Sequence, residues 1–234
     1  MNGRVALAFE VVAIAIIAGT VNAYANGPYT SGTTGYDVSY PNCGVTPSGA
    51  FAIVGVNGGR PFSTNGCFQA EYAAAPQSPV PSLYINTGYS GAYRKNINSA
   101  CSSQSGTVTG SSAQKQAWAI GCSEADTSIQ YAQRAASMWW LDVETGNSWS
   151  SSNLVLNQYT IEGVINRFAQ TGLPVGVYST ASMWNTITGG SFTPPSVVVY
   201  DWVAGGSCSS PFMPSTTVWL TQTMSGGVDY DTAC

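Results

Sequence analysis

The feature that most constrains the fold is an alternation of short apolar segments with helical patterns. Five runs are rich in valine, isoleucine, tyrosine and tryptophan and are bounded by glycine, proline, serine or asparagine, as buried strands are. They cover residues 35–41, 51–59, 82–89, 138–145 and 174–180. Helical periodicity follows at residues 126–137 and 153–172, and the second of these patterns ends in a Gly-Leu-Pro stop. Strands that alternate with helices predict a mostly parallel sheet, open or closed into a barrel.

The last third of the chain has a different pattern. Segments 196–204, 216–224 and 227–231 have strand character, with loops and no helical period between them. Five strand–helix units followed by three strands predict an α/β fold, a TIM-like barrel with an irregular closing side. The Ser/Gly/Thr-rich segment 99–112 is expected to be a long excursion before the fourth strand.

The start of the chain has the features of a secretory signal peptide. Arg4 precedes an apolar segment from Val11 to Ala18, and small residues follow at Val21 and Ala23. An uncleaved anchor helix is the alternative, but the uninterrupted apolar run is short for a membrane span. We therefore expect a signal peptide over residues 1–25 and a single barrel domain over residues 26–234, secreted and free of the membrane after cleavage.

Six cysteines follow the expected signal, and an even set in an exported protein indicates disulfides. Proximity in the sequence favours pairing Cys43 with Cys67, Cys101 with Cys122, and Cys208 with Cys234. None of the six has the spacing of zinc ligands, and the chain contains no histidine, so we expect neither a zinc site nor a cofactor.

The charge composition excludes several functional classes. Charged residues make up only 8% of the chain and its net charge is −4, with no basic patch that would attract nucleic acid. The absence of histidine also removes the usual general base for a serine or cysteine nucleophile. Carboxylates remain as the candidate catalytic groups.

Two of these carboxylates lie inside an apolar strand, in the segment WWLDVE at residues 139–144. Residues two apart on a strand share a face, so Trp140, Asp142 and Glu144 point the same way. They also lie at the carboxyl end of the strand, where barrel enzymes place their chemistry. Burial of unpaired carboxylates is costly, so a paired cation, a metal or a function is expected to compensate for it.

Barrel closure would bring further acids to the same rim. The first and last strands of a closed barrel are neighbours, so Asp37 in the first strand would meet Asp229 in the last. Asp201 competes with Asp229, but alternation in the sixth strand puts Asp201 on the face opposite to Tyr200 and Trp202. The sequence therefore predicts a ring of four acids: Asp37, Asp142, Glu144 and Asp229.

A ring of carboxylates with aromatic residues and without histidine suits the cleavage of a glycosidic bond. One carboxylic acid of raised pKa protonates the leaving oxygen, and another carboxylate stabilises or attacks the developing oxocarbenium centre. Sugars stack on aromatic faces, and the predicted substrate-binding residues are Trp140, Tyr89, Tyr178, Tyr200 and Trp202. A calcium site formed by the same acids is an alternative interpretation.

Five motifs, in the same order along the chain, resemble those of glycoside hydrolase family 25, the lysozyme-type muramidases. GYDVSYP resembles the opening strand of that family, WWLDVE its Asp-x-Glu strand and PVGVYST its strand ending in Tyr-Thr or Tyr-Ser. DWVAG resembles the Trp-x-Ala strand and VDYD the closing Val-Asp. The resemblance covers almost the whole mature chain and implies a flattened (β/α)5(β)3 barrel.

The resemblance also implies roles for the acids. Glu144 corresponds to the proton donor, and Asp37, Asp142 and Asp229 complete the cluster, with assistance from the N-acetyl group of the substrate. The implied substrate is an N-acetylated polysaccharide, foremost bacterial peptidoglycan. The chain departs from the family at VGVNGG, where a Lys and a Glu-Gly are frequent, and at LYINTGY, where Tyr-His-Phe is frequent. These departures change residues expected to contact the substrate, whereas the four acids are kept.

Two other functions remain open at the level of the sequence. The barrel can be a catalytically silent carbohydrate-binding or cell-surface module, or the acids can hold structural calcium. Retention of all four acids favours the enzyme, because binding alone does not require a buried proton donor. We expect a monomer whose partner is a cell-wall glycan.

Overall fold

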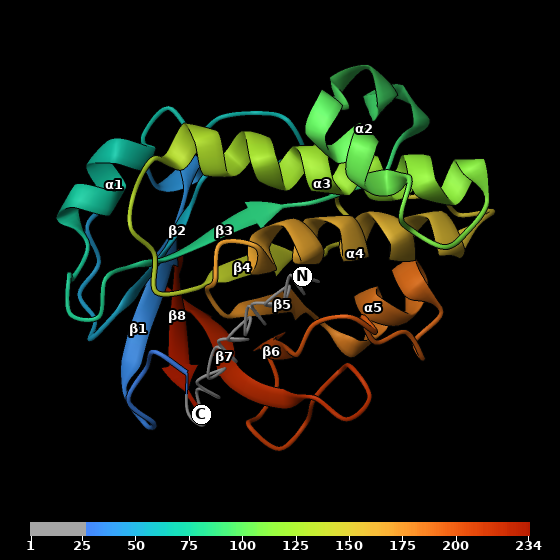
Figure 1. Cartoon of the computed structure of the whole chain (residues 1–234). Coiled ribbons are helices and arrows are strands. Elements are labelled where there is room, and N and C mark those ends of the chain that lie inside the picture. The colour runs from blue at the N-terminus through green and yellow to red at the C-terminus, as the bar shows by residue number, and fades with distance from the viewer. Residues whose placement is uncertain (1–26) are drawn as a thin grey trace, which may run out of the picture.

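The computed structural model describes residues 27–234, which form a closed eight-stranded barrel (Figure 1). The strands follow one another around the barrel in sequence order, β1 to β7 run parallel, and β8 is antiparallel to both β7 and β1. They are β1 (Thr34–Val38), β2 (Ala52–Gly55), β3 (Ser82–Asn86), β4 (Trp139–Asp142), β5 (Val175–Ser179), β6 (Val199–Ala204), β7 (Thr217–Ser225) and β8 (Val228–Ala233). The predicted α/β barrel with three consecutive closing strands is confirmed. The expected signal peptide lies outside the described residues.

Five α-helices connect the strands up to β6, and none separates β6, β7 and β8. They are α1 (Phe68–Ala74), α2 (Ser99–Ser105), α3 (Ser112–Ala132), α4 (Leu154–Ala169) and α5 (Ala181–Thr188). Figure 1 shows α3 and α4 side by side along one flank of the barrel. Within residues 27–234, no helix combines the length and the apolar character that a membrane crossing requires.

The first predicted strand–helix unit lacks an α-helix. The connection from β1 to β2 contains only a short 3₁₀ helix, η1 (Tyr40–Asn42). Pro41 and Pro47 explain this difference, because proline has no backbone N–H and interrupts the hydrogen-bond ladder of a helix.

The long excursion before β4 is more helical than its composition suggested. The prediction of a helix over residues 126–137 was wrong at its start, because α3 begins at Ser112. A capping box starts the helix: Gln114 N–H donates to Ser111 Oγ over 3.3 Å, and Ser111 N–H donates to Gln114 Oε1 over 2.6 Å. The helix ends where Gln133 adopts a left-handed conformation, with φ of 46°.

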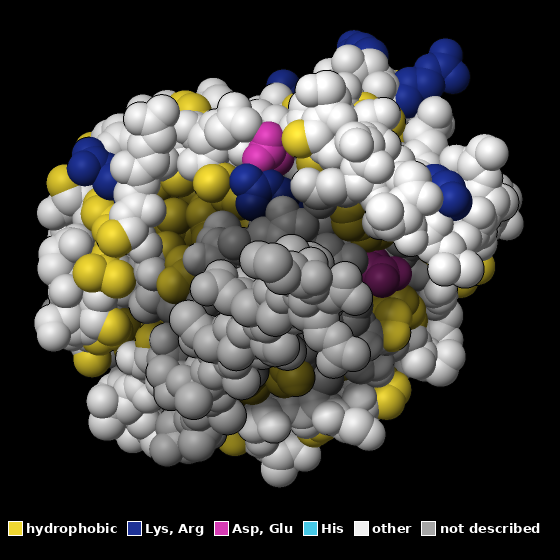
Figure 2. Space-filling model, viewed as in Figure 1, with side chains coloured by type: hydrophobic (Ala, Val, Ile, Leu, Met, Phe, Trp, Pro, Cys, Tyr) yellow, Lys and Arg dark blue, Asp and Glu magenta, His cyan; other side chains and the backbone are white. Residues whose placement is uncertain are grey.

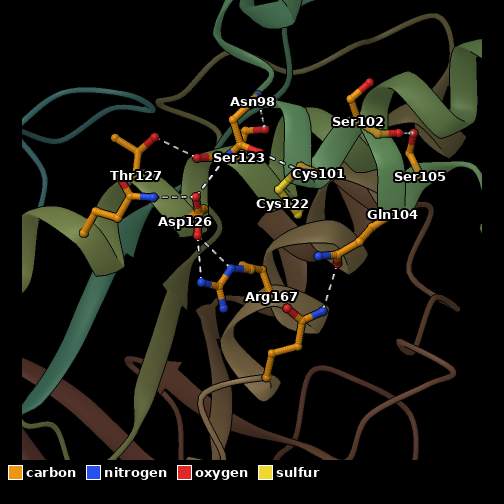
Figure 3. The surroundings of a disulfide bond; sticks show 12 residues. Asn98, Cys101, Ser102, Gln104, Ser105, Cys122, Ser123, Asp126, Thr127 and Arg167 are labelled. Atoms are coloured by element: carbon orange, nitrogen blue, oxygen red, sulfur yellow. Dashed lines mark hydrogen bonds and ion pairs between the residues drawn. A yellow bond between two sulfur atoms is a disulfide. The ribbon is translucent and has the colours of Figure 1, made fainter.

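An ion pair fixes the outer helices to one another (Figure 3). Arg167 on α4 donates from Nη2 to Asp126 Oδ1 on α3 over 2.7 Å. The other carboxylate oxygen of Asp126 accepts from Asn98 Nδ2, over 2.8 Å, at the start of α2. Asp126 therefore joins all three helices beside the disulfide of Cys101 and Cys122. Figure 2 shows Lys and Arg side chains at several separate places on this face and few Asp or Glu side chains.

Two apolar layers follow from the alternation of side chains along the strands. Inside the barrel, Trp140 packs edge-on against Trp202, with ring centroids 5.6 Å apart. Outside it, Trp139 stacks on Phe168 of α4 at a centroid distance of 4.3 Å. Neighbouring tryptophans of β4 thus belong to different layers, as a period of two requires.

The three disulfides predicted from proximity are confirmed: Cys43–Cys67, Cys101–Cys122 and Cys208–Cys234. The third links the loop after β6 to the residue that follows β8. Cys234 N–H also donates to the carbonyl oxygen of Trp219 on β7 over 2.9 Å. The end of the closing strand is therefore anchored by a covalent bond and a backbone hydrogen bond.

Removal of the Cys208–Cys234 bond by the double substitution C208S/C234S should destabilise the fold and loosen β8 first. The bond closes a loop with a sequence separation of 26, which the chain-entropy model converts to about 3 kcal/mol of unfolding free energy. Denaturant unfolding checks the total, and hydrogen exchange checks the location. The matched control C101S/C122S should lower stability similarly without making the β8 amides exchange ahead of the rest of the barrel. Loss of protection in β8 no greater than in the other strands of C208S/C234S would contradict this view of the closing strand.

Candidate active site

A cleft of about 420 Å³ opens at the carboxyl ends of the parallel strands. All four acids predicted from the sequence line it: Asp37, Asp142, Glu144 and Asp229. The rest of the lining is uncharged and includes Ser39, Tyr40, Pro41, Gly59, Tyr84, Asn86, Asn147, Tyr178, Trp202, Gln222 and Met224. The cleft is therefore acidic and contains no basic side chain.

Strand register brings the acids together. Asp37 lies near the carboxyl end of β1 and is paired directly with Asp229 of β8. Because β8 runs antiparallel, the residue near its beginning reaches the same rim as the ends of the other strands. Asp142 ends β4 on the inner face, and Glu144 follows two residues later.

Asp37 is buried, and a chain of hydrogen bonds from neutral side chains fixes its carboxylate. Burial, with the nearby charge of Asp229, raises the pKa of Asp37 to about 7. Gln222 Nε2 donates to Asp37 Oδ2 over 2.8 Å, which favours the charged form and limits the rise. The hydroxyl of Tyr178 donates to Gln222 Oε1 over 2.7 Å and so fixes the orientation of that amide.

Asp142 and Glu144 differ in their access to the cleft. Asp142 is 6% exposed, and burial followed by the charge of Glu144 raises its pKa well above the usual value. Asn86 Nδ2 donates to Asp142 Oδ2, whereas Oδ1 has no hydrogen-bond partner among the described residues. Glu144 is partly exposed, and its pKa is raised by burial first and by the charge of Asp229 second. Glu144 is therefore the more accessible proton donor of the two.

The loop after β4 holds the backbone of Glu144. The indole Nε1 of Trp149 donates to the carbonyl oxygen of Glu144 over 2.7 Å. The N–H of Asn147 donates to the same oxygen over 3.2 Å. Just before Glu144, Val143 N–H donates to Tyr178 O on β5 over 2.9 Å. These bonds restrain the position of the glutamate relative to the strands.

Two of the predicted aromatic residues reach the cleft. Tyr178 lines it with a partly exposed ring, and Trp202, only 2% exposed, packs against Tyr178 at the cleft floor with a centroid distance of 4.7 Å. Tyr89 lies in an adjacent hollow of about 490 Å³ that also includes Trp149. Asn147 borders both spaces, so Tyr89 is next to the acidic cleft and outside it.

The prediction that Trp140 contacts substrate needs correction. Trp140 faces inward as alternation required, but it has no exposed surface and does not line the cleft. Its Nε1 donates to the hydroxyl of Tyr29 over 2.9 Å. Its ring occupies the space above Gly176, where an added Cβ would come within 2.0 Å of the ring. Trp140 therefore fills the barrel interior.

Tyr200 also lies away from the cleft. It stacks on Trp219 at a centroid distance of 3.4 Å and is paired with Gly176 and Thr217 near the amino end of β6. Alternation predicts which face of the sheet a strand residue lies on, but not its height along the barrel axis. Tyr200 lies too near the amino end of β6 to line the cleft at the carboxyl ends.

Two further aspartates clarify the closing strands. Asp201 faces the outer layer, as alternation predicted, and its Oδ2 accepts from the N–H groups of Phe212, over 2.7 Å, and Met213, over 3.1 Å. Asp231 was not predicted as a site residue. It is fully buried on the inner face, and Trp202 Nε1 donates to its Oδ1 over 2.8 Å. Its spacing of two from Asp229 is the signal that places both on one face.

The calcium interpretation has no geometric support in the described part of the chain. Possible ligand atoms converge within 4.8 Å of one another only at Cys43, Cys67 and Glu71. The two cysteines there are joined in a disulfide. The carboxylates of the cleft do not form such a group.

The buried acids predict that the fold is more stable at mildly acidic pH than at neutral pH. Burial raises the pKa of Asp37 to about 7 and that of Asp201 to about 6, and it raises the pKa of Asp231 well above its usual value. The folded state therefore holds protons that the unfolded chain, with aspartate pKa values of about 3.9, has already released. The unfolding free energy should be greatest near pH 4 and should fall as pH rises toward 7. Thermal melting between pH 4.5 and 7.5 measures this slope.

The variant Asp231→Asn provides the control for this pH dependence. Its amide oxygen can still accept from Trp202, and it carries no titrating proton. The melting temperature should therefore fall less between pH 4.5 and 7.5 than in the parent. A parent protein whose stability rises over this range would show that the buried acids do not carry raised pKa values.

Known proteins share this architecture. The family model of Lys-1, described as lysozyme-like protein 1, matches residues 84–221. The bacterial lysozyme from Streptomyces coelicolor superposes with a TM-score of 0.57 at 22% identity, covering 88% of this chain and 93% of that one. A family 25 glycosyl hydrolase from Bacillus anthracis gives 0.52 at 13% identity, with coverages of 86% and 88%.

The modular Cpl-1 endolysin, solved in complex with a peptidoglycan analogue, gives a TM-score of 0.54 at 14% identity. The match covers 88% of this chain and 55% of the endolysin. No curated protein sequence matches the chain. The barrel fold is therefore that of family 25, as the sequence motifs implied.

Proposed function

The chain belongs to the Lys-1 family of lysozyme-like proteins, and we propose that it is a secreted muramidase that cleaves β-1,4 glycosidic bonds of peptidoglycan. The observation that carries this proposal is the acidic cleft at the carboxyl ends of the strands. Its four carboxylates have raised pKa values and no basic side chain beside them. Such a site retains a proton for an acid-catalysed reaction at mildly acidic pH.

Glu144 is the proposed proton donor. It is the more accessible acid of the β4 pair, and its backbone is held by Trp149. In the first step the proton of Glu144 passes to the glycosidic oxygen as the bond from this oxygen to the anomeric carbon breaks. Water then adds to the anomeric carbon and its proton returns to the Glu144 carboxylate, which restores the starting state.

The other acids stabilise the positive charge that develops on the sugar. Asp37 and Asp229 are paired across β1 and β8 and both line the cleft, which supports a role for one of these carboxylates beside the reacting ring. The resemblance to family 25 assigns an aspartate to the ring formed when the substrate N-acetyl group assists. Burial raises the pKa of Asp37 to about 7 and the amide of Gln222 limits that rise, so Asp37 gains the negative charge that this role requires as the pH approaches neutrality.

Peptidoglycan fits the uncharged remainder of the cleft. Tyr178 is partly exposed and offers aromatic surface, and Asn147 offers an amide, whereas Trp202, only 2% exposed, forms the floor of the acidic space. Tyr89 in the adjacent hollow is the proposed contact for a neighbouring sugar. The endolysin of the same fold binds a peptidoglycan analogue, which supports the choice of glycan.

Export is part of the proposal. Three disulfides link all six cysteines, and such bonds persist in oxidising compartments. Polymeric cell-wall glycan is also found outside the cytoplasm. The expected signal peptide, cleaved after about residue 25, would deliver the enzyme to its substrate.

Replacement of Glu144 by Gln should lower turnover at least about a hundredfold, because general acid catalysis contributes roughly 10²–10⁴-fold. The amide keeps the shape of the side chain and cannot donate an acidic proton. Mass analysis of sugars released from purified peptidoglycan measures the loss, with chitin as the second substrate. Near-normal release by Glu144→Gln would remove this residue from the mechanism. Tight glycan binding by the parent without any release would instead favour a catalytically silent binding module.

A pair of aspartate variants tests which closing-strand acid takes part. Asp229→Asn should impair turnover while the fold stays intact, because Asp229 lines the cleft opposite Asp37. Asp201→Asn should retain most turnover and change the melting temperature, because Asp201 binds the backbone of the outer loop. Kinetics on peptidoglycan, read beside thermal melts of both variants, checks the assignment. The opposite pattern would contradict it.

A further inference from the structure

Tyr40 is an aromatic side chain that stands exposed at the mouth of the acidic cleft. Half of its surface is accessible, and it is part of the cleft lining. Of the large hydrophobic residues exposed in the described part of the chain, only Tyr40 and Met224 line this cleft. Because a tyrosine ring has apolar faces and a polar hydroxyl, a half-exposed tyrosine in a polar cleft offers a flat apolar surface to a ligand.

A glycine in the connection between β2 and α1 makes room for the ring of Tyr40. A Cβ added to Gly59 would lie 2.7 Å from a ring carbon of Tyr40 and 3.0 Å from its hydroxyl oxygen. Gly59 also has φ of +77°, a left-handed conformation that favours glycine. The hydroxyl side of the ring is therefore packed against bare backbone, and the remainder of the ring stays accessible.

The segment that carries Tyr40 is fixed at both ends. Before it, Ser39 N–H donates to Asn42 Oδ1 over 3.1 Å, and Asn42 N–H donates back to the Ser39 carbonyl oxygen over 2.7 Å. After it, the disulfide of Cys43 and Cys67 ties the segment to the start of α1. Tyr40 is thus ordered before any ligand arrives, which lowers the entropy cost of binding to it.

We propose that Tyr40 is a stacking platform for a sugar ring of the substrate and determines the affinity of the cleft for glycan. This inference rests on the proposed function. Tyr40 lines the same cleft as the four acids, so a sugar ring stacked on it would occupy the space that they border. Its immediate neighbours in the lining, Pro41 and Gly59, are uncharged, which suits the neutral face of a hexosamine. A single ring in a concave site offers too little area for a protein interface.

Binding to a catalytically impaired protein gives the direct test. Calorimetric titration with a peptidoglycan tetrasaccharide measures glycan affinity in the Glu144→Gln background. Tyr40→Ala should lower this affinity on the order of tenfold, as the loss of an aromatic anchor residue does. Tyr40→Phe should stay within about twofold of the Glu144→Gln parent, because it keeps the ring. Gly59→Ala should weaken binding by displacing the ring from its seat. In the active enzyme, Tyr40→Ala should raise KM more than it lowers kcat.

The matched control is Val45→Ala, which removes an exposed apolar side chain from the same connection and outside the cleft. It should bind as the parent does, and thermal melts of all variants report whether each is folded. Unchanged affinity of Tyr40→Ala while the active enzyme still cleaves peptidoglycan would overturn the platform alone. Equal losses in Tyr40→Phe and Tyr40→Ala would also overturn it, because the hydroxyl would then be the contact. If the unmutated protein does not cleave peptidoglycan and the Glu144→Gln protein does not bind it, the proposed function and this inference are overturned together.

Discussion

The antiparallel pairing of β8 with β1 closes the barrel, and the candidate active site depends on it. The register runs from Thr34 paired with Thr232 to Asp37 paired with Asp229. A slip of one residue would turn the inward acids of β8 to the other face of the sheet. Closure therefore creates the stable fold and the acidic cleft in one step, and the anchored chain end protects both.

The acids that closure brings together accept hydrogen bonds from uncharged side chains. Gln222 donates to Asp37, Asn86 to Asp142 and Trp202 to Asp231. A hydrogen-bond donor without charge satisfies one oxygen and leaves most of the cost of ionisation in place. An arginine or lysine in the same position would hold the acid ionised and remove its proton. The scarcity of bases in the chain is consistent with a site that must keep a proton available.

The aromatic residues divide into core and cleft according to their level along the barrel axis. Trp140 fills the space left by Gly176, whereas Trp202 lies higher and forms part of the cleft floor. Tyr40 is outside the strands and owes its place to Gly59. Small residues thus decide which rings are buried and which can meet a ligand, and the substrate wall can vary while the acids stay fixed.

The sequence by itself determined the strand order, the alternation of faces, the disulfide partners and the identity of the four cleft acids. The faces and the disulfide partners depend on local periodicity and on proximity along the chain, whereas the choice of the four acids also required the assumption that the first and last strands meet. Only the tertiary structure decided that Trp140 and Tyr200 lie below the cleft, that Gln222 orients Asp37, and that Asp231 is buried beneath Trp202. Those outcomes depend on the stagger of strands that are distant in sequence and on the volume of facing side chains. The stagger and the packing volume are not encoded in any single segment, because they are fixed only when the strands pair around the closed barrel.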